Sequence, residues 1–374
     1  RPKEKESIGG LLRALPALRQ RFGRVQVSFG QPLVLGDTLE RVRPGWRAEG
    51  YDDEARPSWF GEAVDAVADQ IMVRINGAAC ATATNLLAFT LLATPRQAML
   101  EGDLVRQLDL YRALLADVPY GPDVSVETLD GAAMIRHGET MGLLERRSHP
   151  LGDVLRMNEE NSVLMTYYRN NVIQLFAMPS LVACAFLNNA QVRTEDIHRL
   201  AWRIYPYARQ ELFLRWGEDE VRAVVDQVLQ ALEKNRLLER TADDKVWRRP
   251  ATGTVEAVQL SVLAQGTVQM IERYYLAIAI LLKAGPDALT PDGLEQRCVT
   301  MAQRMALLYG LAAPEFFDKA MFRAFIDLLR RRGVVTTAAG GRLAYGDALL
   351  AVAADAQVVL SDQIRHSILQ VTHS

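Results

Sequence analysis

Apolar residues recur at i, i+3 and i+4 from residue 61 to residue 189. This spacing places them on one face of an α-helix, and such a face is stable only when it packs against another element. Pro95, Pro119 and Pro122 interrupt the pattern, so we expect several helices in succession. The sequence therefore predicts a helical, bundle-like unit.

A helix, helix, hairpin order occurs twice in the following residues. Thr194 and Thr290 are each expected as a helix N-cap, because acidic residues or proline follow in the first turn. After a second helix, residues 236–250 (RLLERTADDKVWRRP) and 334–346 (VVTTAAGGRLAYG) each predict two short strands around a turn. This order is typical of winged-helix units, and it rests on spacing, because residue identity between the two segments is low.

The N-terminal part predicts one strand. In residues 23–33 (GRVQVSFGQPL), apolar Val25, Val27 and Phe29 alternate with polar residues before a Gly and Pro turn. A lone strand is not stable, so we expect its sheet to lie upstream of residue 1 or in another chain. The chain does not begin with Met and has no signal-peptide core, so we expect it to be an interior segment of a longer protein.

The predicted fold class is mainly α (α+β). A chain of 374 residues exceeds the usual size of a single core, and we divide it into four segments. Residues 1–45 hold the strand, 46–190 form a helical domain, 191–250 form a winged-helix-like unit, and 251–374 form a helical segment with a second such unit.

The three most apolar windows, residues 77–93, 172–187 and 274–282, are too short or too polar to span a bilayer. Buried core helices are favoured over contact with a membrane surface, which stays open.

Composition and cysteine spacing argue against several classes of protein and of binding site. Lys+Arg 43 against Asp+Glu 45 gives net charge -2, so charge does not favour a nucleic-acid partner. Cys80, Cys184 and Cys298 lie far apart with no CxxC pair, which argues against both a disulfide framework and a zinc site. Their small apolar neighbours predict buried free thiols in a reducing environment. We expect no metal and no cofactor.

A search for catalytic motifs is negative for GxSxG, GxxxxGK[ST], GxGxxG and HExxH. His149 and Asp153 could form a general base, but the intervening Pro and Gly predict a solvent turn. His137 and His198 have no acid and nucleophile nearby in sequence and are expected on helix faces or the surface. The winged-helix-like order raises an alternative function, a stand-alone interaction or nucleic-acid module that salt-dependent DNA binding would identify. Residues 330–332, three arginines, are better explained as a helix C-terminus.

Residues 163–176 (VLMTYYRNNVIQLF) place a polar cluster inside an apolar helical run. On a helix, Tyr168, Arg169 and Asn170 point in different directions, so some of these polar groups must be buried. Buried arginine and asparagine need partners, which carboxylates and backbone carbonyls supply in a seam between helices, or phosphate supplies in a ligand site. The residue types favour the seam and leave the ligand site open.

Six segments resemble the C-terminal half of the bacterial membrane glycerol-3-phosphate 1-O-acyltransferase family. They are KEKES (3–7), VSFGQPL (27–33), MVRIN (72–76), VLMTYYRNN (163–171), ELFLRW (211–216) and APEFFDKA (313–320). The resemblance implies a parent enzyme that transfers an acyl group from acyl-CoA or acyl carrier protein to position 1 of glycerol 3-phosphate, in phospholipid biosynthesis. It implies a location on the cytoplasmic side of the bacterial inner membrane, peripheral or monotopic. Residues 1–45 would then be the C-terminal remnant of an α/β acyltransferase core, which accounts for the lone strand.

The resemblance also implies what this chain lacks. The family's base is a histidine followed, after four residues, by aspartate, whereas three residues separate His149 from Asp153 and they match no catalytic block. We therefore assign no catalytic residue and expect the chain alone to be inactive. Its expected partners are the catalytic half of the enzyme, through that half the acyl donor and glycerol 3-phosphate, and the membrane surface. Tyr168, Arg169 and Asn170 are the candidates for facing the substrate pocket, because a desolvated arginine beside aromatics holds phosphate or carboxylate well.

Overall fold

The computed structural model describes residues 25–48, 56–243, 245–309, 317–360 and 365–368. The fold is mainly helical with small sheets, as predicted. The helices are α2 (Leu35–Val42), α3 (Phe60–Gly77), α4 (Ala83–Leu92), α5 (Glu101–Asp117), α6 (Gly131–Thr140), α7 (Ser162–Asn170), α8 (Ile173–Cys184), α9 (Thr194–Leu212), α10 (Val221–Lys234), α11 (Val255–Ala284), α12 (Pro291–Tyr309), α13 (Lys319–Arg331) and α14 (Asp347–Val359). The strands are β1 (Cys80–Ala81), β2 (Ala98–Leu100), β3 (Ser125–Val126), β4 (Leu144–Arg147), β5 (Val154–Met157), β6 (Gln191–Arg193), β7 (Glu239–Arg240), β8 (Val246–Arg248), β9 (Val335–Thr337) and β10 (Leu343–Tyr345).

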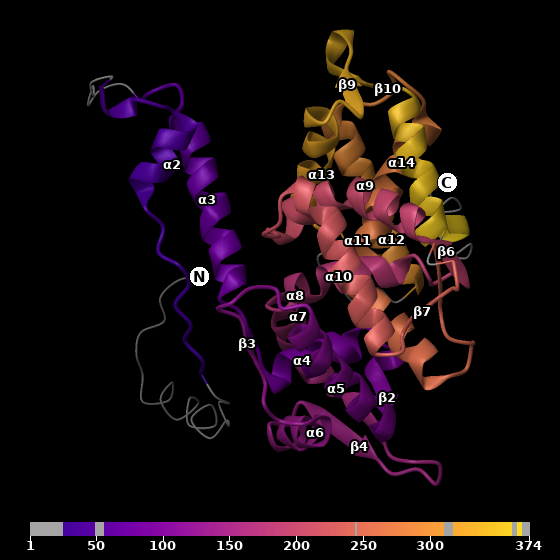
Figure 1. Ribbon diagram of the computed structural model, residues 1–374. Coiled ribbons are helices and arrows are strands. Elements are labelled where there is room, and N and C mark those ends of the chain that lie inside the picture. The colour runs from indigo at the N-terminus through magenta and orange to yellow at the C-terminus, as the bar shows by residue number, and fades with distance from the viewer. Residues whose placement is uncertain (1–24, 49–55, 244, 310–316, 361–364, 369–374) are drawn as a thin grey trace, which may run out of the picture.

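Two apolar helices, α8 and α11, form the centre of the molecule and pack along each other (Figure 1). Thr254 caps α11, where its side chain accepts from the backbone N–H of Ala257 at 3.2 Å. α11 then runs for 30 residues, about 45 Å, and buries most of its side chains. The apolar windows predicted as core helices are thus buried in α4, α8 and α11. Among the described residues, no helix has the length and apolar character needed to cross a bilayer.

Two three-stranded sheets share one topology. In the first, β2 precedes α5 and α6, β4 and β5 follow them, and the strand order is β2-β5-β4. In the second, β6 precedes α9 and α10, β7 and β8 follow them, and the order is β6-β8-β7. The hairpin predicted for residues 236–250 is confirmed as β7 and β8. The first unit, by contrast, lies within residues that the sequence predicted as helical, so its sheet was missed.

A third unit repeats the same pairing. Its helices are α12 and α13, and its hairpin is β9 and β10, as predicted for residues 334–346. The N–H of Asp287 donates to the carbonyl of Leu343 at 2.9 Å, and the N–H of Leu343 donates to the carbonyl of Leu289 at 2.8 Å. The segment before α12 therefore pairs with β10 as β2 pairs with β5. The described residues contain three winged-helix-like units, one more than the spacing predicts.

The two predicted threonine caps differ. Thr290 caps α12 as expected, because its hydroxyl accepts from the N–H of Gly293 at 3.1 Å. The cap predicted at Thr194 is wrong: this residue is the first of α9, after Arg193. Its hydroxyl donates to the carbonyl of Lys245 at 3.2 Å and accepts from the indole N–H of Trp247 at 3.1 Å. The hydroxyl fixes the second unit's hairpin because β6 brings Thr194 beside β8.

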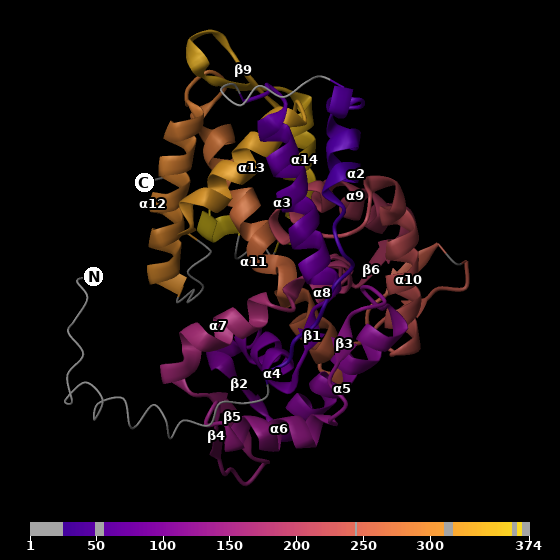
Figure 2. The same cartoon turned by 90° about the vertical axis from the view of Figure 1, so that its left-hand side faces the viewer.

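The α2–α3 hairpin stands apart from the rest of the chain and meets it at the C-terminal end of α3 (Figures 1 and 2). Thr38 and Gln70 join its two helices through their side chains at 3.1 Å. The strand predicted in residues 23–33 is not formed. Residues 25–34 are irregular, and Val25, Val27 and Phe29 are 87%, 71% and 89% exposed. Residues 25–33 make no backbone hydrogen bond to another described segment, so their alternating pattern has no sheet to join.

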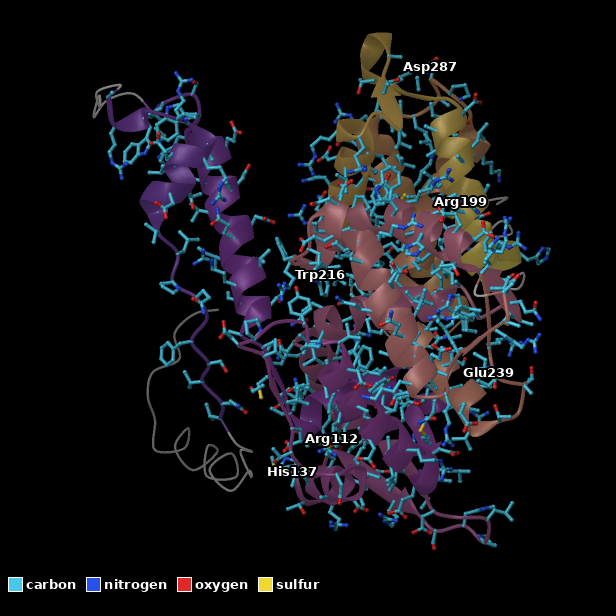
Figure 3. All side chains as sticks on the ribbon, in the orientation of Figure 1. Arg112, His137, Arg199, Trp216, Glu239 and Asp287 are labelled. Carbon is cyan, nitrogen blue, oxygen red and sulfur yellow. The ribbon has the colours of Figure 1, made fainter. Side chains whose placement is uncertain are left out.

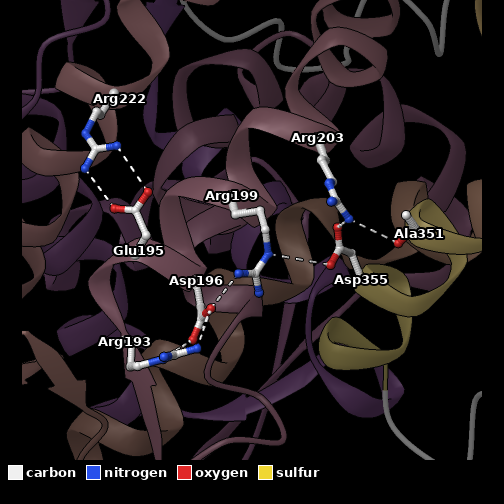
Figure 4. Close-up of polar contacts among 8 residues, drawn as sticks. All are labelled: Arg193, Glu195, Asp196, Arg199, Arg203, Arg222, Ala351 and Asp355. Atoms are coloured by element: carbon white, nitrogen blue, oxygen red, sulfur yellow. Dashed lines mark hydrogen bonds and ion pairs between the residues drawn. The ribbon is translucent and has the colours of Figure 1, made fainter. Parts of the chain in front are cut away.

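An ionic network joins α9 to its neighbours (Figure 4). Asp196 accepts from Arg193 and Arg199, and Asp355 of α14 accepts from Arg203 on the same side of α9. On α10, Arg222 pairs with Glu195 at 2.9 Å. These pairs are partly or fully exposed, so they orient the helices and contribute little to stability.

Candidate functional site

Three of the segments that carry the family resemblance meet at the C-terminal end of α3. Arg74 (in MVRIN) donates to the carbonyls of Gln31 and Pro32 (in VSFGQPL), the first at 2.9 Å. The amide of Asn76 donates to the carbonyls of Leu212 and Phe213 (in ELFLRW) at 2.7 and 3.1 Å. These carbonyls lie at the end of α9, where Phe213 adopts a left-handed conformation with φ 51°. Asn76 thereby satisfies acceptors that the end of the helix leaves open.

A pocket lies beside this junction and reaches the fourth segment, VLMTYYRNN. Its wall contains residues of α4, α7, α8, α9 and α11: Phe89, Leu92, Ala93, Arg169, Ile173, Glu211, Gln265, Gly266, Gln269, Met270 and Arg273. Its volume of about 50 Å³ compares with roughly 10–15 Å³ for one water. This volume corresponds to a group of the size of a few waters. The lining combines apolar side chains with two arginines, two glutamines and one glutamate.

Arg169 lies on this pocket, at the end of α7, and is half-buried. Burial lowers the pKa of its guanidinium to about 10. The side-chain oxygen of Asn170 accepts from its Nε at 3.1 Å and from its Nη2 at 2.9 Å. This amide sets the orientation of the guanidinium plane without neutralising its charge.

The second arginine, Arg273, is 3% exposed and belongs to α11. Its Nη2 donates to Glu211, and the hydroxyl of Tyr274 donates to the other oxygen of the same carboxylate at 2.8 Å. Burial acts to lower the pKa of Arg273, but the charge of Glu211 outweighs it and the pKa is raised. Glu211 thus holds a buried cation at the pocket wall. The pocket lining contains three ionisable side chains, Arg169, Glu211 and Arg273.

The structure brings one of the three predicted site residues to the pocket. Arg169 lines it, whereas Tyr168 and Asn170 do not. Tyr168 is half-buried against the core, and its carbonyl accepts from the side chain of Asn85 on α4 at 2.8 Å. Asn170 is exposed and contacts Arg169. The polar cluster is therefore partly a seam between α4 and α7 and partly a pocket wall.

Of the described histidines, His149 is the candidate for a general base, and its side chain is not paired with Asp153. Asp153 accepts from Arg146 at 2.9 Å and from Ser148 at 3.0 Å, while the Nδ1 of His149 accepts from the N–H of Leu151. His149 and Asp153 are not paired, in agreement with the predicted solvent turn. His137 lies at the lower end of the molecule in Figure 3, away from the pocket.

His198 lies on a face of α9, one of the two places expected for it, and this face is buried. It is 6% exposed, and its Nε2 lies 2.8 Å from the carboxylate of Asp226 on α10. The acid was not found in the sequence because α10 brings it from the next helix. The pair lies between α9 and α10, buried on the histidine side, where it joins the helices.

The cysteines are free thiols, and two of the three are buried as predicted. Burial raises the pKa of Cys184 to about 12 and raises that of Cys298. Cys80 is the exception, since it is half-buried and its thiol donates to Gln26 at 2.8 Å. The reason is its place on β1, a short strand near the N-terminal segment. Within the described ranges, no three His, Cys, Asp or Glu side chains are grouped to hold a metal ion.

The described residues of α10 and α13 make contacts within the chain. The apolar face of α10 is buried against α8 and α9. At the end of α13, Arg330 contacts Asp327 and Thr337, Arg331 donates to Gln210, and Arg332 pairs with Glu218 at 2.7 Å. These arginines connect α13 to α9 and the η4 turn (Glu218–Glu220), as helix-terminal cations do.

Comparison with known proteins identifies the same family that the six sequence segments resemble. A family model described as glycerol-3-phosphate acyltransferase C-terminal region matches residues 1–338. A glycerol-3-phosphate acyltransferase of Xanthomonas campestris pv. campestris is 42% identical over 100% of this chain and 42% of its own length. One of Pseudomonas aeruginosa (strain PAO1) is 44% identical over 99% of this chain and 44% of its own length. The chain spans less than half the length of these relatives, and it belongs to the glycerol-3-phosphate acyltransferase family, of which it matches the C-terminal region.

Proposed function

We propose that this chain is the supporting C-terminal region of a glycerol-3-phosphate 1-O-acyltransferase. In this role it completes the substrate pocket for a catalytic half that transfers the acyl group from acyl-CoA or acyl carrier protein. The observation that carries the proposal is a pocket lined by Arg273 and by Arg169 and Glu211, which belong to two family segments, next to the junction that Asn76 of a third segment makes with the end of α9. Segments far apart in sequence come together where a ligand fits, and a structural seam alone does not need a pocket.

The α2–α3 hairpin offers a surface on which the catalytic half would dock. Phe60, Val64, Ile71 and Ile75 are exposed on α3, and their spacing puts them on one stripe about 22 Å long. A stripe of this kind on an otherwise separate hairpin indicates a partner surface. The occupant we propose is the remaining part of the acyltransferase, since the matched relatives are more than twice as long as this chain.

Membrane contact belongs to the same proposal. Val163, Leu164 and Tyr167 are exposed on α7, and apolar and aromatic side chains are favourable at the level of lipid headgroups. We place the assembled protein at the cytoplasmic side of the bacterial inner membrane, peripheral or monotopic.

A two-part acylation assay tests the proposed function. This chain is mixed with, or fused behind, the part of the Pseudomonas aeruginosa relative that lies outside the match. We expect no acylation of labelled glycerol 3-phosphate by the chain alone with long-chain acyl-CoA in lipid micelles. Activity should appear with the fusion, which should also sediment with phospholipid vesicles. Activity from the chain alone, or an inactive fusion that is correctly folded, would contradict the proposal.

Substitution of Arg169 tests the pocket within the active fusion. Arg169→Ala is expected to raise the KM for glycerol 3-phosphate about 10- to 100-fold, because one charge-assisted contact to phosphate contributes roughly 1.5–3 kcal/mol. The KM for acyl-CoA should stay within about twofold. Arg222→Ala is the matched control, since Arg222 is exposed and pairs with Glu195 away from the pocket. An unchanged KM for glycerol 3-phosphate in a folded Arg169 variant would mean that this residue has only a structural role in the seam between helices.

A further inference from the structure

The α2–α3 hairpin is a long arm that meets the body of the molecule at the C-terminal end of α3 (Figures 1 and 2). α3 has 18 residues and is therefore about 27 Å long. The exposed apolar stripe of Phe60, Val64, Ile71 and Ile75 lies along most of this length. A rotation of about 10° at the attached end would move the other end by about 5 Å. The contacts at the attached end thus decide where the stripe is presented.

Asn76, in the last turn of α3, joins the arm directly to the backbone of another helix. Its side-chain nitrogen donates to the carbonyls of Leu212 and Phe213 at 2.7 and 3.1 Å. Carbonyls at the end of a helix have no partner within that helix, and an amide nitrogen carries two N–H donors. One side chain therefore satisfies two acceptors at the end of α9. Two bonds from a single group also fix the direction in which α3 leaves the body.

The turn that Asn76 contacts is itself held firmly. Phe213 has φ 51°, a left-handed conformation that a residue other than glycine keeps only where its surroundings impose it. The N–H of Arg215 donates to the hydroxyl of Tyr120 at 3.2 Å, and the hydroxyl of Tyr205 donates to the carbonyl of Trp216 at 2.7 Å. Tyr120 and Tyr205 are buried. A fixed pair of acceptors gives a fixed orientation to the helix that donates to it.

A second attachment of the arm is indirect and runs through residues 25–34. Arg74 donates to the carbonyl of Gln31 at 2.9 Å, and the amide of Gln31 donates to the carboxylate of Asp123 at 3.3 Å. Gln31 and Asp123 are exposed, so water competes for this contact. The bonds of Asn76 are partly buried and reach the body in one step. We therefore expect Asn76 to contribute most to the orientation of the arm.

We propose that Asn76 is a positioning residue that presents the apolar stripe of α3 to the catalytic half in one fixed orientation. The inference rests on the proposed function, which it deepens by naming the residue that prepares the docking surface. An arm with a fixed orientation needs no ordering step when the partner docks. In an arm with many orientations, docking weakens in proportion to the fraction that is competent. Asn76 acts through the arm and is not a catalytic residue.

The distance between two spin labels on the 374-residue chain tests the orientation directly. The labels are attached at Glu62→Cys on α3 and Gln230→Cys on α10, two exposed positions, in a Cys80→Ser background that removes the half-buried thiol. We expect one narrow distance distribution, and a distribution at least about twice as wide after Asn76→Ala, because two hydrogen bonds are lost. Asn76→Asp should widen it equally, since the carboxylate has the size of the amide and no N–H to donate.

Asn189→Ala is the matched control. The side-chain nitrogen of Asn189 donates to the carbonyls of Ala185 and Val358 at 2.8 and 3.2 Å, so this substitution also removes two hydrogen bonds to backbone. These bonds join the end of α8 to α14, which lies across the molecule from α3 in Figure 1. The control should leave the label distance unchanged, and urea unfolding checks that both variants are folded. A wide distribution in the wild type, or an equally narrow one in Asn76→Ala, overturns the inference.

The fusion used in the acylation assay measures the consequence for docking. Asn76→Ala is expected to lower kcat at least about threefold, because only molecules whose arm has the docked orientation are active. The KM values for glycerol 3-phosphate and acyl-CoA should stay within about twofold, since the substrate contacts of docked molecules are intact. Asn189→Ala should change neither quantity. An Asn76→Ala fusion with an unchanged kcat also overturns the inference.

Failure of this inference and failure of the proposed function give different results. An active fusion together with a wide label distribution in the wild-type chain rejects the role of Asn76 and leaves the proposed function standing. A narrow distribution that depends on Asn76, together with a silent fusion, rejects the proposed function and leaves Asn76 as the residue that orients the arm.

Discussion

Replacing Arg273 with methionine is expected to lower the free energy of unfolding by about 3–5 kcal/mol, because removal of one partner of a buried ion pair leaves the other charge uncompensated. The side chains of Arg273 and Glu211 are 4% and 15% exposed. After the substitution, the described contacts of Glu211 reduce to the hydroxyl of Tyr274. Denaturant unfolding followed by circular dichroism measures the change as a shift of the midpoint.

The double variant Glu211→Gln/Arg273→Met separates the lost charge from lost packing. With the carboxylate gone, most of the stability should return, because a neutral pair needs no compensation. Arg222→Met is the matched control and should change stability by less than about 1 kcal/mol, since both Arg222 and Glu195 are exposed. If Arg273→Met lowered the free energy of unfolding no more than this control does, the ion pair would be accessible to water. The guanidinium of Arg273 would then not be fixed at the pocket.

The helical fold could be predicted because its signal is local. The apolar runs of α8 and α11 and the Gly-rich turn between β9 and β10 lie within single segments. The first winged-helix-like unit was missed for a physical reason. Its α6 packs so closely on α5 that a Cβ at Gly131 would lie 2.5 Å from the carbonyl oxygen of Val105. This contact joins positions far apart in sequence, and the sequence shows only a glycine at the start of a short helix.

The candidate site could likewise be predicted only where its signal was local in sequence. Arg169 could be found because an arginine inside an apolar helical run needs a partner wherever it lies. Glu211 and Arg273 were missed, since 61 residues separate them and their pairing exists only after α9 packs beside α11. A signal was nevertheless available: Glu272 and Arg273 interrupt the apolar run of α11. Adjacent residues of a helix point in different directions, so two buried charges in succession must face different surroundings.

The pH dependence of stability is expected to come in large part from Glu272. It is 6% exposed, and burial raises its pKa to about 7 from the ordinary value of 4.5. A carboxyl whose pKa is raised on folding is favoured in its protonated form. Below about pH 4.5 it carries no penalty, and the penalty grows as pH rises and is complete above about pH 7. The difference between 4.5 and about 7 corresponds to about 3 kcal/mol.

Glu272→Gln should therefore stabilise the chain by about 2–3 kcal/mol at pH 8 and leave it nearly unchanged at pH 4.5, measured by urea unfolding at both values. Glu239→Gln is the control, because Glu239 is exposed on β7 (Figure 3) and should give no such difference. A Glu272 variant whose advantage is equal at both pH values would assign the effect to side-chain packing. A loss of stability at pH 8 would mean that the ionised carboxylate is solvated or paired in the folded chain. Arg273 and Glu272 are adjacent on α11 but face different surroundings because of the helix geometry. The ionised form of Arg273 is stabilised by its buried partner Glu211, whereas Glu272 is more stable in its neutral form.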